Sequence, residues 1–523
     1  MAKRTYFVHL IIIFIAAFLV NKAPSVLTGI PLNRQLSSDA EVHINHWREF
    51  STNNPVDFSN DRMFSQGIWP RGQLFIDKLL VKTGELFGQE AADWSIFISI
   101  IALVFFLSGV YFVITYSTQS PFWGLILSLG SIIPTISLGG SSWGFLTKGF
   151  LPRELGLGIT VWLSALYFYS LKNNSRAHRY LAFAITGIFT NWYPILFLHF
   201  FLMLFVAEII RQKSFNKEHA LYILFFVIGA PLAFIDFFTK SSDMSPMNMA
   251  VFYDRFKYML LNSPAYALTK YLRRSIIYTV LVVIVFLQNR ILKNRVGGNI
   301  LIWQNIWLSS GVLSIFGVLI ENFTPFAKFL ISRTSIWFIF SSMVMLAYGA
   351  ETARKNIKIW SGINRFWGLT IFAFLLLVVF LGQSSLVSIY RNVRGLRASS
   401  SEYSQYITGL EQLKTITPAS SIILAHPKNA DDIRVYGKRG TWVSWKDGNI
   451  AILDGKGATE WFERTQKTSE VLEQKDFTKI KSFARENGIG YFFYRKGDVT
   501  DGFQELEKNT IFKSGIFGVA RIP

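Results

Sequence analysis

Long apolar segments recur from near the N-terminus to about residue 386, and they limit the fold of this chain more than any other feature. They cover residues 6–21, 94–116, 122–138, 155–170, 180–191, 193–210, 219–239, 275–288, 300–320, 335–350 and 366–386. About 20 mainly apolar residues make a helix long enough to cross a bilayer. The chain is 51% hydrophobic, and its mean hydropathy is +0.33. We therefore predict an α-helical polytopic membrane protein with about 11 transmembrane helices.

Two of these segments, 180–191 and 193–210, are almost continuous in the sequence. Between them lie the letters TNWYP, which contain Asn191 and Pro194. Proline lacks the backbone N–H that a helix interior needs, and it ends or kinks a helix. We therefore expect two antiparallel helices joined by a tight hairpin.

The distribution of lysine and arginine predicts the orientation. If the N-terminus is cytoplasmic, the inner loops contain 15 basic residues, against about 10 in the outer loops beyond the first. Cytoplasmic loops of membrane proteins carry such an excess. An odd number of spans then places the loop 22–93, the segment 240–274 and everything after about Val387 outside. We expect an integral membrane protein with its N-terminus in the cytoplasm.

The first apolar segment could be mistaken for a cleaved signal peptide. It runs from Tyr6 to Val20 after Lys3 and Arg4, and Lys22 follows almost directly. No A-x-A-like cleavage site follows it, so we interpret it as a retained signal anchor.

Composition excludes several classes of function. The net charge of +20 would suggest nucleic acid in a soluble protein, but here many basic residues lie in short loops, where they orient helices and meet lipid headgroups. We therefore predict no nucleic-acid partner. The chain has no cysteine, which excludes disulfides and thiolate chemistry. It also has no phosphate-binding G-x-x-x-x-G-K-[ST] motif and no H-E-x-x-H motif.

The last part of the chain has mixed charges and ordinary polarity. We predict a transmembrane domain over residues 1–390 and a soluble extracytoplasmic α/β domain over 391–523, called the tail domain below. Its predicted elements are a helix over 401–416, strands at 421–426 and within 432–445, two helices across 458–488, and strands at 489–495 and 515–522.

The first outer loop opens with SSDAEVHINHWREF, in which Asp39 and Glu41 form a D-x-E pattern. If this stretch is helical, Asp39, His43 and His46 share one face. The plainer interpretation is a hydrated loop whose acids cap a helix. The sharper one is a site for a divalent ion such as Mg²⁺ or Mn²⁺, because carboxylate and imidazole suit such ions. Apolar positions from Leu74 to Leu86 predict an amphipathic helix along the outer interface.

Basic residues near the outer ends of two spans are candidates for binding phosphate. Arg153 follows Pro152 at the start of the fourth span, Lys148 lies just before it, and Arg333 lies at the start of the tenth. Guanidinium and ammonium groups suit phosphate. A salt bridge for Arg153 and contact with lipid headgroups for Arg333 explain the same residues. Asp236, inside an apolar run, could be a relay or a partner for Arg333.

The tail domain contains the stretch KRGTWVSWKDG, which places Trp442 and Trp445 among the cations Lys438, Arg439 and Lys446. Aromatic faces beside cations suit stacking on sugars and contact with phosphate, so we predict a site for a glycan acceptor at the two tryptophans. A buried tryptophan core of a small domain is the alternative.

Taken together, the first span, the long outer loop with its acidic motif, the TNWYP hairpin and the outer α/β tail resemble the GT-C superfamily of integral membrane glycosyltransferases. Tail segments such as IRVYGKRGTWVSWKDG and FARENGIGYFFYR look like those of uncharacterised bacterial members, and this resemblance implies a bacterial inner (plasma) membrane as the location. The resemblance implies transfer of a hexose or pentose from a polyprenyl-phosphate-linked donor to a glycan, lipid or protein acceptor of the cell envelope. The family's acidic residue maps onto Asp39, with Glu41 as the second acid. No strong D-x-D motif occurs in the second large outer loop, which puts metal dependence in doubt.

Two further classes of function fit the same residues. A transporter or flippase of a lipid-linked saccharide would use a wet cationic cavity but no catalytic base. A non-catalytic membrane protein would bind glycan through residues 391–523 alone.

Overall fold

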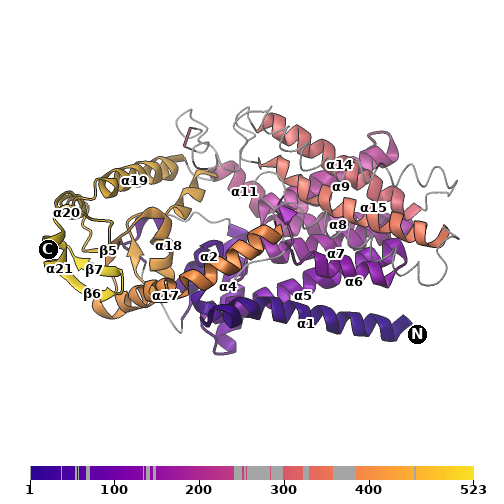
Figure 1. Cartoon of the computed structure of the whole chain (residues 1–523). Coiled ribbons are helices and arrows are strands. Elements are labelled where there is room, and N and C mark those ends of the chain that lie inside the picture. The colour runs from indigo at the N-terminus through magenta and orange to yellow at the C-terminus, as the bar shows by residue number, and fades with distance from the viewer. Residues whose placement is uncertain are drawn as a thin grey trace.

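The computed structural model of the chain describes residues 2–36, 38–52, 56, 58–65, 71–133, 135–136, 142–144, 149–240, 250–251, 255, 279, 283, 298–321, 329–356, 385–452 and 455–523. Most of these residues are helical. A helical bundle and a smaller domain with a sheet lie at opposite ends of the molecule, and a layer of short helices lies between them (Figure 1).

The bundle contains six helices that are long and apolar enough to cross a membrane, among the residues described. They are α1 (Ala2–Thr28), α5 (Ala91–Thr118), α7 (Pro152–Lys172), α9 (Pro194–Gln212), α14 (Gly298–Ile320) and α15 (Ser335–Asn356). A seventh span results if α10 (Lys217–Gly229) and α11 (Pro231–Lys240), which are bent by 77°, count as one. The prediction of about 11 spans is therefore confirmed only in part; its segments 275–288 and 366–386 fall outside the described residues, apart from positions 279, 283 and 385–386.

One predicted span, 122–138, is wrong in its length. Helix α6 (Pro121–Gly130) ends after 10 residues. The chain then turns, and β1 (Thr135–Ile136) pairs antiparallel with β2 (Ser142–Trp143). The turn brings Trp143 into the bundle core, where its ring stacks on Phe340 at 4.3 Å between centroids. Burial of this large ring compensates for the shortened helix.

The hairpin between α8 (Arg176–Thr190) and α9 is confirmed, with Pro194 in the first turn of α9. Asn191 does more than interrupt the helix. Its side-chain amide donates to the carbonyl of Gly229 at 2.7 Å and accepts from the amide of Ala233 at 3.0 Å. One asparagine thereby satisfies backbone groups that the break between α10 and α11 exposes.

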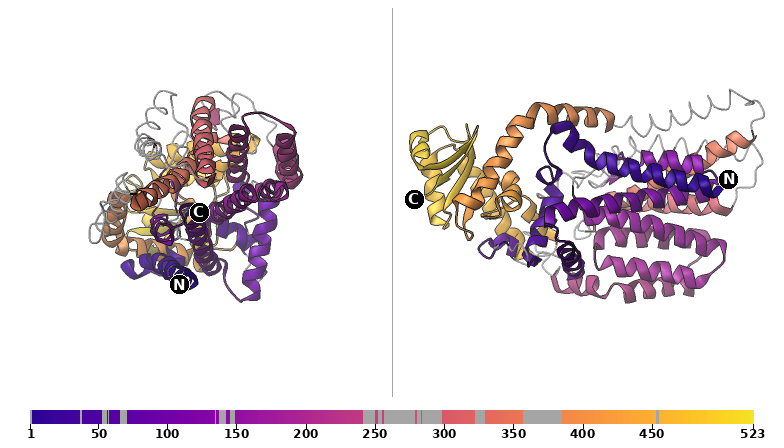
Figure 2. Two further views of the ribbon diagram at one scale, coloured as in Figure 1. Left: turned by 90° about the vertical axis from the view of Figure 1, so that its right-hand side faces the viewer. Right: turned by 90° about the horizontal axis from the view of Figure 1, so that it is seen from below.

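Three short helices form the layer at the end of the bundle next to the tail domain, which is the end predicted to face outward: α2 (Ser38–Phe50), α3 (Arg62–Ser65) and α4 (Arg71–Leu86). The view from below separates the bundle from the tail domain and places these segments between them (Figure 2). Helix α4 confirms the predicted amphipathic helix. Phe75 and Leu79 are exposed on one side of it, whereas Asp77 and Val81 are buried on the other, as expected for a helix lying at an apolar interface.

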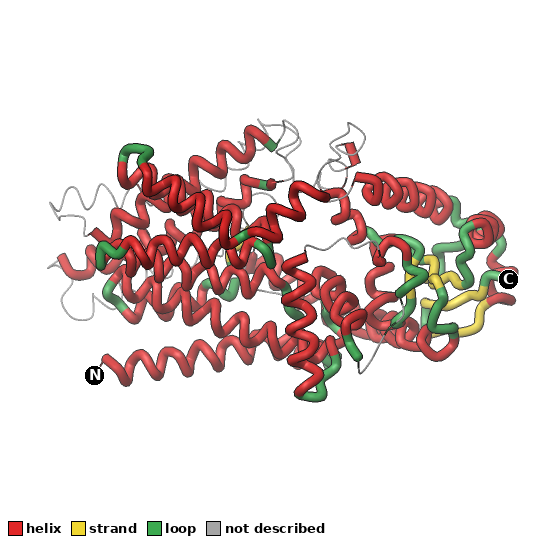
Figure 3. The backbone as a smooth tube through the Cα atoms, turned by 180° about the vertical axis from the view of Figure 1, so that it is seen from behind, coloured by secondary structure: helices red, strands yellow, loops and turns green. Residues whose placement is uncertain are grey.

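The tail domain contains a five-stranded sheet in the order β4-β3-β5-β7-β6. Its strands are β3 (Ile422–Leu424), β4 (Gly440–Thr441), β5 (Tyr491–Arg495), β6 (Thr510–Ser514) and β7 (Phe517–Arg521). Its helices are α17 (Ser385–Ile416), α18 (Ala430–Asp432), α19 (Gly455–Glu473), α20 (Phe477–Glu486) and α21 (Phe503–Asn509). Figure 3 shows the strands of this sheet together at this end of the molecule. Helix α17 continues across the predicted boundary between residues 390 and 391.

The predicted strand within 432–445 is mostly wrong. Residues Ile433–Gly437 form a π-helical turn, η6, and only Gly440–Thr441 extend as a strand. All five residues of the turn are buried, because it lies between α17 and helix α2 of the outer layer. Helix α21 and strand β6 were not predicted.

Candidate functional site

Helix α2 begins against the segment that leads into α7. A Cβ on Gly149 would lie 2.9 Å from the Cβ of Ala40. The Phe150 amide donates to the hydroxyl of Ser95 at 2.8 Å, and the Phe150 ring packs on Trp47 of α2 at 5.5 Å. The backbone of Asp39 therefore lies in the first turn of α2, beside the segment that precedes Arg153; the side chain of Asp39 lies outside the described part of the chain.

Arg153 lies in the first turn of α7 and is half-buried. Its Nε atom is buried and has no hydrogen-bond partner among the residues described. The N-terminus of a helix carries partial positive charge, so the positive charge of Arg153 there is unfavourable unless an anion is nearby. The arrangement suits a phosphate, which could accept from the guanidinium and from helix N–H groups. Lys148 lies outside the described residues.

Arg333 is half-buried in the short helix η4 (Ile331–Thr334), which leads into α15. This segment packs on α9 and α14. Glu321, just beyond α14, holds it by accepting from the backbone N–H of Ser332 at 2.7 Å and from its hydroxyl at 2.9 Å. Arg333 thus lies at the same end of the bundle as Arg153, on a different set of helices. Asp236 forms an ion pair with Arg71 of α4 at 3.3 Å.

Glu41 lies on the side of α2 that faces the tail domain. It is buried, and the hydroxyl of Tyr436 donates to it at 3.5 Å. Burial first, and then the neighbouring carboxyl of Asp432, raises the pKa of Glu41 well above its usual range. The predicted second acid is therefore placed in a buried contact between α2 and the tail domain.

His43 and His46, two of the three predicted metal ligands, contact other side chains, and the side chain of the third, Asp39, lies outside the described residues. The ring of His46 is buried against Phe64, 5.1 Å between centroids. Burial, and secondly the Arg434 charge, lowers the pKa of His46 to about 3. A cation beside a guanidinium would be repelled. His43 is hydrogen-bonded to Gln73 of α4. In the described chain, no three acidic or histidine side chains are grouped so as to hold a metal ion.

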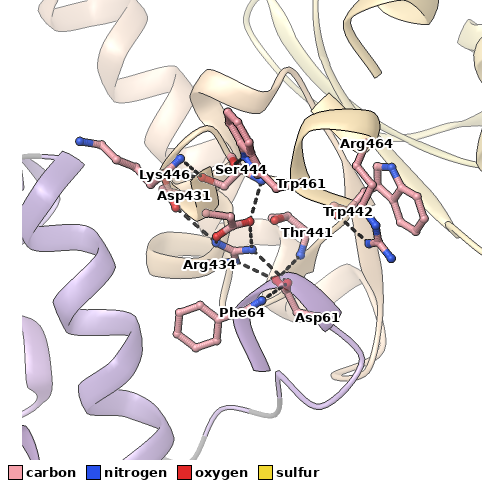
Figure 4. A network of polar contacts seen from close by, with 11 residues as sticks. Asp61, Phe64, Asp431, Arg434, Thr441, Trp442, Ser444, Lys446, Trp461 and Arg464 are labelled. Atoms are coloured by element: carbon pink, nitrogen blue, oxygen red, sulfur yellow. Dashed lines mark hydrogen bonds and ion pairs between the residues drawn. The ribbon is translucent and has the colours of Figure 1, made fainter. Parts of the chain in front are cut away.

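A buried network around Arg434 joins the first outer loop to the tail domain (Figure 4). The guanidinium of Arg434 donates to Asp61 at 2.7 and 3.0 Å and to Asp447 at 2.7 and 2.8 Å. A further contact to Asp431 is 3.3 Å long. Arg434 is only 1% exposed. Burial would lower the pKa of the guanidinium, but the carboxylates of Asp447 and Asp61 outweigh it and raise that pKa.

Two of the carboxylates in this network also accept hydrogen bonds from other groups. Asp61 accepts from the Thr441 amide at 2.9 Å, and Asp431 accepts from the Ser444 hydroxyl at 2.6 Å. Burial raises the pKa of Asp431 to about 7, against the lowering effect of Arg434. The network is therefore nearly fully hydrogen-bonded, as a buried ion cluster must be to persist.

Arg48 fixes α2 from a second direction. Its guanidinium donates to the carbonyl of Val435 in η6 and to the carboxylate of Glu90 at 2.9 and 2.7 Å. Glu90 is the N-cap of α5. Helix α2 is thus connected to a membrane-spanning helix and to the tail domain by one side chain. We call the buried contact surface between α2, α3 and residues 430–447 the seam.

Two arginines from outside the predicted stretch lie over the tryptophans of the tail domain. The Arg464 guanidinium lies 3.8 Å over the ring of Trp442, and that of Arg255 lies 4.9 Å over Trp445. Arg439, by contrast, is buried and donates to backbone carbonyls of Lys414 and Thr417 at the end of α17. Its role is to satisfy that helix terminus.

Sequence reasoning missed Arg434 and the three aspartates around it. The spacing of Asp431 and Arg434, three residues apart, was compatible with a helical ion pair. Nothing local pointed to Asp61, which is 373 positions away in the sequence.

No protein-family model matches the chain, and no curated protein matches it. Several solved structures are similar. The crystal structure of the Archaeoglobus fulgidus oligosaccharyltransferase in the apo form has 14% identity and a TM-score of 0.48, covering 93% of this chain and 69% of that one. The archaeal oligosaccharyltransferase AglB from the same organism, in complex with an inhibitory peptide and a dolichol-phosphate, has 12% identity and a TM-score of 0.48, covering 94% and 70%. TM-scores of this size do not establish a shared fold.

Proposed function

We propose that the chain is a membrane glycosyltransferase that transfers a sugar from a polyprenyl-phosphate-linked donor to an acceptor at the outer face of a plasma membrane. The observation that carries the proposal is the contact between the start of α2 and the segment 149–150. It brings the backbone of Asp39 close to the outer end of α7, where the buried Nε of Arg153 has no partner within the described chain. A base and a phosphate-binding cation on adjoining segments are what this reaction needs.

In the proposed reaction, Asp39 accepts the proton of an acceptor hydroxyl. The acceptor oxygen forms a bond to the anomeric carbon of the donor, and the bond from that carbon to the phosphate oxygen breaks. The electron pair of the broken bond leaves with the lipid phosphate. Arg153, and Arg333 from η4, would stabilise the charge that develops on the leaving phosphate. A phosphate leaves readily, so a second catalytic acid is not required.

The tail domain supports this reaction by holding α2 in place. Arg48 and Glu41 contact residues of the π-helical turn, and Arg434 binds Asp61 of the first outer loop. A base must be held within a fraction of an ångström of its working position. We infer that the seam fixes the orientation of the helix that carries Asp39.

The decisive test compares the wild type with Asp39→Asn in full-length protein reconstituted in liposomes. Short-chain polyprenyl-phosphate donors with radiolabelled hexose or pentose are supplied, and both sugar transfer and release of lipid phosphate are measured. Asp39→Asn should lose at least a hundredfold in transfer, because general bases contribute about 10²–10⁴-fold, and should still bind the donor. Asp93→Asn is the matched control, because Asp93 is exposed in the first turn of α5.

A second pair of variants tests the phosphate-binding residues. Arg153→Gln and Arg333→Gln should weaken donor binding, because each removes a charge-assisted contact to phosphate.

Transfer that is unchanged in Asp39→Asn would contradict the assigned base. If the wild type moves a labelled donor across the membrane but transfers no sugar, the protein is a flippase and not a glycosyltransferase.

A further inference from the structure

A cavity of about 420 Å³ opens next to the seam and shares Thr441 with it. Asn60 of the first outer loop and residues of the tail domain line it. Ligand sites of proteins fall in the range of about 300–1,000 Å³. Asn60 donates to the carbonyl of Ser420 at 3.0 Å, so the wall of this cavity is shared by two segments that are distant in the sequence.

Two buried polar atoms in the wall have no hydrogen-bond partner among the described residues: Oγ1 of Thr441 and Nε1 of Trp442. Thr441 is 2% exposed. A buried hydroxyl or indole N–H without a partner is costly and is rare in native proteins. Both residues line the cavity, so a polar molecule bound there would lie next to these two buried atoms.

The cation of the wall is held in place. The guanidinium of Arg464 lies 3.8 Å over the ring of Trp442, donates to the Trp442 carbonyl at 3.2 Å, and pairs with Glu460 at 2.8 Å. Figure 4 shows Trp442 and Arg464 next to Thr441 and at the edge of the Arg434 network. The wall therefore presents an ordered set of polar groups.

We propose that this cavity is a saccharide-binding subsite. Its lining consists of hydroxyl groups, the amides of Asn60 and Asn487, an indole and one guanidinium, with Ile422 as the aliphatic member. Amides, hydroxyls and an indole recognise the many hydroxyl groups of a sugar. In the proposed transferase the cavity would hold part of a glycan acceptor; this role rests on the proposed function, but saccharide binding itself does not.

The glycines of the wall provide a way to fill the cavity without removing a contact. A Cβ on Gly490 would meet no atom within 4 Å. Gly490→Leu should therefore occupy the cavity at little cost to the fold. Thr441→Val keeps the shape of the side chain and removes only its hydroxyl. Lys479→Leu, on the exposed side of α20, is the control for an added apolar side chain.

The experiment measures binding of chitotetraose, cellotetraose, maltotetraose and tetragalacturonate to the full-length protein in nanodiscs, by saturation-transfer NMR and calorimetric titration. At least one of these saccharides should bind with equal affinity to the wild type and to Lys479→Leu. Gly490→Leu should weaken it at least tenfold, and Thr441→Val about fivefold, the size expected for one neutral hydrogen bond. No binding by the wild type, equal binding by Gly490→Leu, or binding of tetrapeptides only would overturn the proposal.

The assay contains no donor, so its result is independent of catalysis. Saccharide binding that persists in Asp39→Asn, whatever the outcome of the transfer assay, supports the subsite. If the wild type binds saccharide but transfers no sugar, the proposed reaction is contradicted and the saccharide subsite is not.

Discussion

Replacing Arg434 by methionine should open the seam. The variant keeps an apolar stem of similar length but leaves Asp61, Asp431 and Asp447 buried together, each 5% exposed or less. Removing one partner of a buried ion cluster costs about 3–5 kcal/mol, because the remaining charges lose their compensation. At 1.4 kcal/mol for each factor of ten, local opening of the seam should become about 10²–10³·⁵ times more frequent.

Hydrogen–deuterium exchange of the full-length protein can measure this opening. The amides of Phe64 and Thr441 both donate to the carboxylate of Asp61, so peptides covering 58–65 and 440–445 should exchange faster by two orders of magnitude or more. Arg495→Met is the matched control. Its ion pair with Glu402 is exposed on both sides, and pairs of this kind contribute about 0–1 kcal/mol.

The destabilisation caused by Arg434→Met should also increase with pH. In the wild type, Arg434 lowers the pKa values of Asp61 and Asp431 against the effect of burial. Without the guanidinium those pKa values rise further, so the folded variant binds more protons than the unfolded chain. The loss of stability in the variant, relative to the wild type, should therefore be largest near pH 8 and become smaller toward pH 5. Exchange within threefold of the wild type at pH 8, or no larger than in Arg495→Met, would refute the reasoning.

Three other variants test the outer layer and the bundle. Burial raises the pKa of Asp77 to about 7, so ionisation of this residue destabilises the fold above pH 7 and has no effect below about pH 4; Asp77→Asn should raise the melting temperature at pH 8 and leave it unchanged at pH 4. A Cβ on Gly72 would lie 2.1 Å from the backbone oxygen of Asn191, so Gly72→Ala should displace α4 and cost about 1–3 kcal/mol in a thermal-shift assay. Trp143→Ala should cost about 3–5 kcal/mol by the same assay, because its buried ring stacks on Phe340.

The parts of the fold that follow from local pattern were predictable. Continuous apolar composition predicted α1, α5 and α9, and Pro194 fixed where the hairpin turns. The strand expected at Ile433–Gly437 failed for a physical reason. Ile433, Val435 and Tyr436 favour strands when isolated, but the turn packs between α17 and α2, so packing overrode propensity.

For the candidate site, the sequence suggested residues but not the contacts between the segments that carry them. The letters around Asp39 and Arg153 pointed to a base and a phosphate-binding cation. They could not indicate that Gly149 would touch Ala40, or that Asp61 would bind Arg434. Contacts between residues so far apart in the sequence depend on the whole topology, which local periodicity does not encode.

The same limit applies to Glu41. Its position two residues after Asp39 suggested a shared chemical task, but successive positions of a helix point in different directions. Glu41 faces the tail domain and forms a hydrogen-bonded carboxyl pair with Asp432. The Tyr406 hydroxyl donates to the other side of Asp432 at 2.6 Å. The geometry assigns Glu41 a part in holding α2.

A pair of carboxyls in this position makes the seam sensitive to alkali. Burial raises the pKa values of both groups, and the neighbouring Asp432 raises that of Glu41 further, whereas hydrogen bonds with Glu41 and Tyr406 only partly lower that of Asp432. The folded state therefore keeps a proton that the unfolded chain loses. The stability that the pair contributes is full at low pH and is lost as pH rises through the raised pKa values. Exchange in α2 and in residues 430–437 should therefore accelerate between pH 6 and pH 9, after correction for intrinsic rates. Glu41→Gln keeps a hydrogen-bond donor and cannot ionise, so it should remain protected at pH 9; equal acceleration in this variant and the wild type would show that the carboxyl pair does not control the seam.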